Sequence, residues 1–182
     1  MHINNISIKV LMKDILYKAA REIKKNIGNN VVLYSKKFTN DLVTAADLAS
    51  ERTIKEEILR HFPDSLIFSE ESDFALDNEK FKKAGVLVFI VDPLDGTKNY
   101  VSGIFDKAIS VGIYKAGVPI FGAVLHLSSN DYYFVGLVLG SLLSHTSPPF
   151  LISPLPKETK TVTGLFTTTA LEILSPWVIS HK

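Results

Sequence analysis

The chain has 182 residues, which is enough for one domain with a sizeable core, and its formal net charge is +1. Such a balanced charge favours neither a nucleic-acid polymer nor a membrane surface as the partner. The sequence contains no cysteine, which excludes disulfides, thiol catalysis and thiolate metal sites and fits a reducing compartment such as the cytoplasm.

Two amphipathic helices are predicted in the first third of the chain. Residues 3–27 carry apolar side chains at helical spacing with lysines between them, and Gly28 ends the pattern. A short apolar run and a polar loop over residues 35–40 follow. The second helix is expected from Thr44 to Phe62, because the next residue is a proline.

Strands are predicted for most of the next 70 residues. The run at 85–91 is almost continuously apolar and rich in β-branched residues, which is typical of a strand that is covered on both faces. Shorter runs of the same kind occupy 65–68, 108–114, 120–127 and 132–135. Two helices followed mainly by strands predict an α+β fold, with both N-terminal helices packed on a mostly antiparallel sheet.

The pattern is lost after about Val135, so an irregular C-terminal tail is expected. No charged residue occurs from Tyr132 to Pro156, but only Tyr132–Leu143 is strongly apolar. Because that stretch is too short to span a bilayer, a buried strand is favoured over a membrane segment. The chain is therefore divided into an α+β unit over 1–135 and an atypical tail over 136–182.

Two carboxylates follow the most apolar run, in VFIVDPLDGTKNY (88–100). The proline after Asp92 restricts the backbone at Asp92, and the glycine after Asp95 allows a left-handed turn. Both carboxylates can therefore face one small volume. Two ionised carboxylates repel each other there unless one is protonated or a cation lies between them. Asp-Pro and Asp-Gly are also common turn formers, so this motif alone would more often be a solvated turn.

Two further acids belong with this pair. Glu70 also follows a short apolar strand, so Glu70, Asp92 and Asp95 would converge if the two strands are neighbours. Oxygen ligands of this kind select a hard cation, Mg²⁺ before Ca²⁺ or Mn²⁺. Asp47 stands three residues after Thr44, which fits a helix capping box and by itself a structural role.

The joint order of the motifs is more specific than any one of them. DLVTAAD (41–47), FSEES (68–72), VDPLDGTKNY (91–100) and AISVGIY (108–114) occur in one series. This series resembles the inositol monophosphatase family of Mg²⁺-dependent, lithium-sensitive phosphatases, over residues 5–135, about the first half of a family member. The resemblance implies the first half of that family's layered fold.

The resemblance also implies roles for individual residues. Glu70, Asp92 and the Leu94 carbonyl would bind one metal ion, and Asp95 would help to bind a second ion that Asp92 bridges. Thr97 would pair with Asp47 to activate the attacking water. Gly96 and Thr97 would contact the substrate phosphate, and Lys36, with Lys37 as the alternative, would lie on a mobile loop near the metals. The implied reaction is hydrolysis of a small phosphomonoester by metal-activated water, in the cytoplasm, with a homodimer left open.

Alternatives remain at this point. DPLDGTK is closer to the 3′(2′),5′-bisphosphate nucleotidase branch, whereas Asn99-Tyr100 is closer to the inositol monophosphatase branch. The W-D-x-A-A-G motif expected in the family's second half is absent, since Trp177 is the only tryptophan and valine follows it. We therefore expect a truncated or frame-shifted chain, and a non-catalytic remnant with a partial metal site is the second hypothesis.

Overall fold

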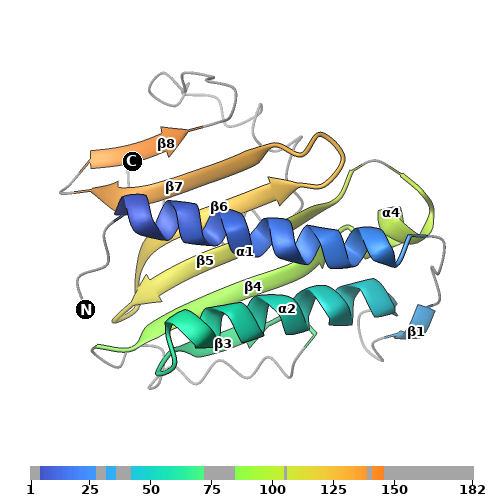
Figure 1. The fold of residues 1–182 in the computed structure, drawn as a ribbon, viewed down its shortest axis with the longest axis horizontal. Coiled ribbons are helices and arrows are strands. Elements are labelled where there is room, and N and C mark those ends of the chain that lie inside the picture. Colours follow the sequence, from blue (N-terminus) through green and yellow to red (C-terminus); the bar gives the residue numbers. More distant parts are fainter. Residues whose placement is uncertain are drawn as a thin grey trace.

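The computed structural model describes residues 5–27, 32–35, 42–71, 85–104, 106–138 and 141–145. Figure 1 shows the arrangement of the helices and strands. In chain order the elements are α1 (Asn5–Lys25), β1 (Val32–Ser35), β2 (Leu42–Thr44), α2 (Ala45–His61), β3 (Leu66–Ser69), β4 (Leu87–Asp95), α4 (Thr97–Val101), β5 (Ala108–Lys115), β6 (Val118–His126), β7 (Tyr132–Val138) and β8 (Ser141–His145). Within the described residues, no helix combines the length and apolar composition that crossing a membrane requires.

The main sheet has the order β3-β4-β5-β6-β7-β8. β3 runs parallel to β4, and each later strand is antiparallel to the one before it. The predicted antiparallel meander is therefore confirmed, and the strands that precede Glu70 and Asp92 are neighbours, which is the condition under which their carboxylates were expected to converge. β1 and β2 form a separate antiparallel pair. The sequence did not predict β2, because a three-residue strand carries no recognisable alternation.

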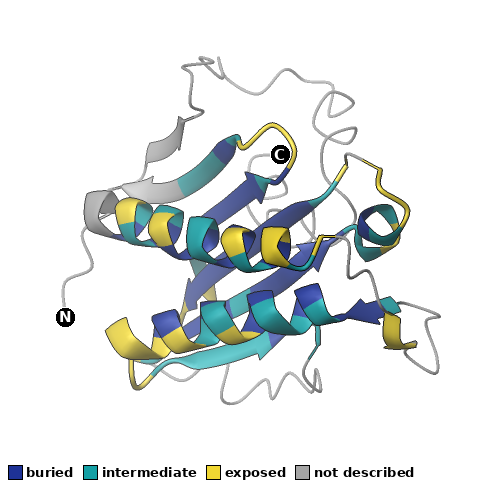
Figure 2. Ribbon diagram, turned by 45° about the vertical axis from the view of Figure 1, so that its right-hand side comes forward, coloured by how far each residue is buried: buried dark blue, intermediate teal, exposed yellow. Residues whose placement is uncertain are grey.

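α1 and α2 lie side by side on one face of the main sheet, α1 across β5, β6 and β7 and α2 over β4 (Figure 1). Their buried sides face the sheet and their outer sides are exposed (Figure 2). The core between the layers is apolar and comes from both helices and alternate strand residues. Its fully buried members include Met12, Ile15, Leu16, Ala19, Ile54, Ile58, Phe89, Ile109, Ile113 and Leu125.

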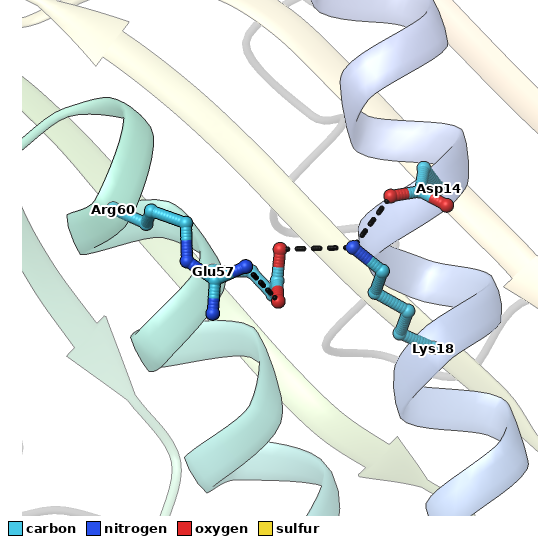
Figure 3. Close-up of polar contacts among 4 residues, drawn as sticks. All are labelled: Asp14, Lys18, Glu57 and Arg60. Atoms are coloured by element: carbon cyan, nitrogen blue, oxygen red, sulfur yellow. Dashed lines mark hydrogen bonds and ion pairs between the residues drawn. The ribbon is translucent and has the colours of Figure 1, made fainter.

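A group of charged side chains joins the outer surfaces of the two helices (Figure 3). Lys18 Nζ lies 2.8 Å from Asp14 Oδ2 on its own helix and 3.0 Å from Glu57 Oε2 on α2. Arg60 Nη1 donates to the other Glu57 oxygen at 2.8 Å. These cations lower the pKa of Glu57, the Lys18 hydrogen bond being the largest cause. The contacts hold α2, and with it the residues of the candidate site, in register with α1.

Two boundaries differ from the sequence-based prediction. β4 does not end before the Asp-Pro-Leu-Asp segment but runs through it to Asp95. The strand favoured over Tyr132–Leu143 is found as β7, which reaches Val138, and β8 pairs with it, so the expected irregular tail does not begin at residue 136. The prediction for residues 146–182 lies outside the described residues.

Candidate active site

A β-bulge at the end of β4 sets the geometry of the candidate site. Asp92 pairs with Ser110 of β5 and Asp95 pairs with Ala108, so three steps along β4 oppose two along β5. Bulges of this kind bend a strand and redirect its side chains, often beside active sites. The four residues from Asp92 to Asp95 are all buried. The sequence predicted a tight turn here, but the structure shows the end of a strand with a β-bulge.

Strand pairing brings Glu70 beside Asp92. β3 and β4 are parallel with Ser69 opposite Val91, and the Glu70 N–H donates to the Val91 carbonyl at 3.2 Å. Parallel strands present their carboxyl ends at the same edge of the sheet. The first residue after β3 therefore lies next to the first carboxylate of the bulge, so the condition for the convergence of Glu70 and Asp92 is met.

Asp92 is the most unusual side chain at this edge. It is only 1% exposed, and neither carboxylate oxygen has a hydrogen-bond partner of normal geometry among the described residues. Burial raises the pKa of Asp92 well above its ordinary value, and the charges of Glu70 and Asp95 raise it further. The Leu94 backbone N–H opposes this rise in pKa without cancelling it, so the carboxylate is buried among other acids with too little hydrogen-bond donation to compensate a charge.

Glu70, Asp92 and Asp95 are not arranged as a complete metal-coordination site in the structure. Across the residues that the structure describes, no group of three or more His, Cys, Asp or Glu side chains is arranged to hold a metal ion as it stands. The metal roles expected for Glu70, Asp92, Leu94 and Asp95 therefore remain predictions.

Asp47 has both of the contacts that the sequence suggested. It is fully buried at the third position of α2, and its Oδ2 accepts from the N–H of Thr44 at 2.8 Å and from the Thr44 hydroxyl. The Thr44 Oγ1 also accepts from the Asp47 N–H, which completes the capping box. The other carboxylate oxygen of Asp47, Oδ1, accepts from the Thr97 hydroxyl at 2.7 Å. Burial raises the pKa of Asp47 despite the opposing effect of these hydrogen bonds.

Thr97 therefore connects α2 to the bulge. Its Oγ1 also lies 3.0 Å from the Leu94 carbonyl oxygen. A hydroxyl has one proton, so Thr97 can donate to Asp47 or to Leu94 but not fully to both. When it donates to Asp47, the Leu94 carbonyl and the Thr97 lone pairs are free for another partner.

Both the backbone conformation and the surroundings at position 96 favour glycine. The φ of Gly96, +86°, lies in the left-handed region, and a Cβ on this residue would sit 2.8 Å from the Asp106 carbonyl oxygen. The residue precedes α4, whose first bond runs from the Tyr100 N–H to the Gly96 carbonyl at 2.9 Å. The sequence did not predict α4, since five residues are too few to show a helical period.

One polar contact to the bulge was not predictable from the motifs. Ser50, 0% exposed on α2, donates its hydroxyl to the Pro93 carbonyl at 2.6 Å. The available signal was its spacing, because Ser50 follows Asp47 by three residues and so shares its helix face. Ser110, which faces Asp92 across the ladder, is also buried and its hydroxyl has no partner within the described ranges. Lys36 and Lys37 lie outside the described residues.

Comparison with known proteins identifies the class. The chain matches the model of the inositol monophosphatase family over residues 7–171, and it belongs to that family. The match continues well past residue 135, where the motif-based resemblance ended.

Individual relatives agree with this assignment. The chain is 40% identical over 126 residues to the fructose-1,6-bisphosphatase/inositol-1-monophosphatase of Aquifex aeolicus, covering 67% of this chain and 44% of that protein. It is 27% identical over 179 residues to the inositol-1-monophosphatase of Bacillus subtilis, covering 98% and 62%. Among solved structures, inositol monophosphatase-II of Staphylococcus aureus superposes with a TM-score of 0.60 at 28% identity, covering 77% of this chain and 50% of that one. The chain thus spans about half the length of the proteins it matches.

Proposed function

We propose that this chain acts in the Mg²⁺-dependent hydrolysis of a small phosphomonoester. The observation that carries the proposal is the Asp92 carboxylate, which is 1% exposed, has no hydrogen-bond partner of normal geometry among the described residues, and has its pKa raised by burial and by the charges of Glu70 and Asp95. A buried charge of this kind is unfavourable unless a cation or a proton compensates it. In a phosphatase family, such a cation would take part in the hydrolysis of the phosphate ester.

The donor set fits magnesium. Glu70, Asp92 and the Leu94 carbonyl would hold one cation and Asp95 would help to hold a second, and all of these ligands are oxygens. Neither oxygen of Asp92 has a hydrogen-bond partner of normal geometry among the described residues, so a cation bound to them would offset the free-energy cost of burying this charge. When bound, Mg²⁺ would supply positive charge against the charge that develops on the phosphoryl group.

The other residues of the site would orient the attacking water. With its proton donated to Asp47, Thr97 Oγ1 can accept a hydrogen bond from a water molecule, and the proton released in the attack can pass through Thr97 to Asp47. Burial raises the pKa of Asp47, which makes it a better proton acceptor than an ordinary aspartate. Gly96 and Thr97 are half-exposed, in contrast to the four buried residues before them, and so could contact the phosphate. The role of Lys36 beside the metals is kept as a family-based prediction.

Two substrate classes are proposed for the test. Inositol phosphates follow from the family and from the Bacillus subtilis relative. Phosphorylated nucleosides are the second class, because a solved relative, SaIMPase-II, has 2′AMP bound and because Lys98 follows the DPLDGT segment in this chain. The lack of cysteine fits a cytoplasmic place of action, and a homodimer stays open.

The test is phosphate release from inositol 1-phosphate and from adenosine 3′,5′-bisphosphate, with and without Mg²⁺. Wild type, Asp92→Asn and the surface control Asp64→Asn would be compared, since Asp64 is exposed on the turn after α2. We expect Mg²⁺-dependent release by wild type and by the control, and loss of it in Asp92→Asn. Equal background rates in all three proteins would contradict catalysis and leave the alternative of a non-catalytic remnant, which would bind Mg²⁺ without turnover.

A further inference from the structure

We propose that Ser50 is a positioning residue for the cation site, through its hydrogen bond to the Pro93 carbonyl. The inference rests on the proposed function and adds to it a residue outside the DPLDGT motif. The hydrogen bond that Ser50 makes within the described residues goes to a backbone carbonyl and not to an acidic side chain. It would act by fixing the backbone that carries them.

The bulge creates the need for this contact. Pro93 lies between Asp92, which still pairs with Ser110, and Asp95, which pairs again with Ala108. Pro93 has no N–H, so its carbonyl is its only backbone hydrogen-bonding group, and the residue is buried. Since the register shift takes it out of the ladder with β5, its carbonyl must find a partner elsewhere. The partner is Ser50 Oγ, at 2.6 Å.

The contact is unusual for a serine inside a helix. Such a hydroxyl usually bonds a carbonyl of its own helix one turn back. Thr53, on the next turn of α2, does so by donating to the Ala49 carbonyl at 2.9 Å. Ser50 instead donates to a residue 43 positions further along the chain, in a different layer of the fold.

Ser50 and Asp47 together hold the bulge from one helix. Asp47 accepts from Thr97, after the two aspartates of the motif, and Ser50 donates to Pro93, between them. The Leu94 carbonyl, a proposed cation ligand, belongs to the peptide unit that follows. Only the two dihedral angles of Leu94 separate it from the Pro93 carbonyl. Fixing the Pro93 carbonyl therefore restricts the orientations that the Leu94 carbonyl can take.

The test compares Ser50→Ala with Thr53→Ala in the full chain. Both changes remove one hydroxyl from α2, and alanine is the best helix former, so both variants should fold. The measurements are the Mg²⁺ dissociation constant by calorimetry, the Mg²⁺ concentration that gives half-maximal phosphate release, and kcat at saturating Mg²⁺. Outer contacts that orient metal ligands typically change metal affinity by 10- to 100-fold.

We expect Ser50→Ala to weaken Mg²⁺ binding about tenfold, with kcat at saturating Mg²⁺ within about twofold of wild type, and Thr53→Ala to change neither. Unchanged Mg²⁺ affinity in Ser50→Ala, beside a wild type that binds Mg²⁺ and hydrolyses substrate, would overturn the Ser50 inference alone. A wild type that neither binds Mg²⁺ nor releases phosphate would overturn the proposed function, and this inference with it.

Discussion

Replacing Asp92 by asparagine should make the metal-free protein more stable while removing its response to magnesium. Asparagine has nearly the same shape as aspartate but carries no charge. Its amide N–H groups could donate to the neighbouring carboxylates of Glu70 and Asp95, which raise the pKa of Asp92 in the wild type. The substitution therefore replaces a repulsive contact by hydrogen bonds.

The size of the effect follows from the burial of the carboxylate. Asp92 is 1% exposed and both of its oxygens lack a donor among the described residues. A buried polar group left in this state costs about 1–3 kcal/mol, and more if it is charged. For a chain of this size, each 1 kcal/mol shifts Tm by roughly 2–4 °C. An increase of about 4–8 °C in the presence of EDTA corresponds to a gain of about 2 kcal/mol.

The same assay with magnesium should reverse the order of the two proteins. A ligand at about 100 times its Kd stabilises the folded state by roughly 2.7 kcal/mol, and only wild type retains the full set of oxygen ligands. Thermal unfolding of wild type, Asp92→Asn and the exposed control Asp64→Asn, each in EDTA and in Mg²⁺, measures both effects. The reasoning is refuted if Asp92→Asn is less stable than wild type in EDTA, or if both respond equally to Mg²⁺.

Three further variants probe other parts of the account. Thr97→Val removes the hydroxyl that joins Asp47 to the bulge, and we expect kcat for phosphate release to fall about 100-fold; activity within twofold of wild type would contradict the proton path. Gly96→Ala forces a side chain into the left-handed region and against the Asp106 carbonyl, so urea unfolding should show a loss of about 2–3 kcal/mol, whereas a loss below about 0.5 kcal/mol would exclude this close approach. The pKa of Glu57 is lowered in the folded state by Lys18 and Arg60. Its ionised carboxylate therefore stabilises the folded state at pH values above 4.5, its ordinary pKa, and this stabilisation is lost as the pH falls through the folded-state pKa. Glu57→Gln should therefore be less stable than wild type at pH 7. Urea titrations should show the difference in unfolding free energy between the two proteins becoming smaller below about pH 4.5, and a difference that grows in acid would contradict this reasoning.

The residues of the candidate site were accessible from the sequence because each follows a strong local signal. Asp92 follows a run that is apolar enough to define a buried strand, and Glu70 follows a shorter one. Once both strands were predicted, their pairing brought the two carboxylates together. Asp47 was predicted as a helix cap from its spacing to Thr44, and its contact with Thr97 came from the family resemblance; the structure contains both contacts.

The details that the sequence did not reveal depend on register and on long-range packing. The bulge between Asp92 and Asp95 exists because β5 pairs with one residue fewer than β4 supplies, and neither strand encodes that shift alone. Ser50 looked like an ordinary helical serine, because its partner is 43 residues away and is defined only by the bulge. β8 was missed because Ser141–His145 shows no alternation, although β7 provides an edge for it to pair with.

The central claim is that Glu70 and Asp92, with the Leu94 carbonyl, hold a divalent cation at the end of β4. The most direct measurement is anomalous X-ray diffraction from crystals of the full chain grown with Mn²⁺, a hard cation that can replace Mg²⁺ on oxygen ligands. The account predicts an anomalous peak bound by the carboxylates of Glu70 and Asp92 and by the Leu94 carbonyl. A peak bound elsewhere, or none at saturating Mn²⁺, would contradict it.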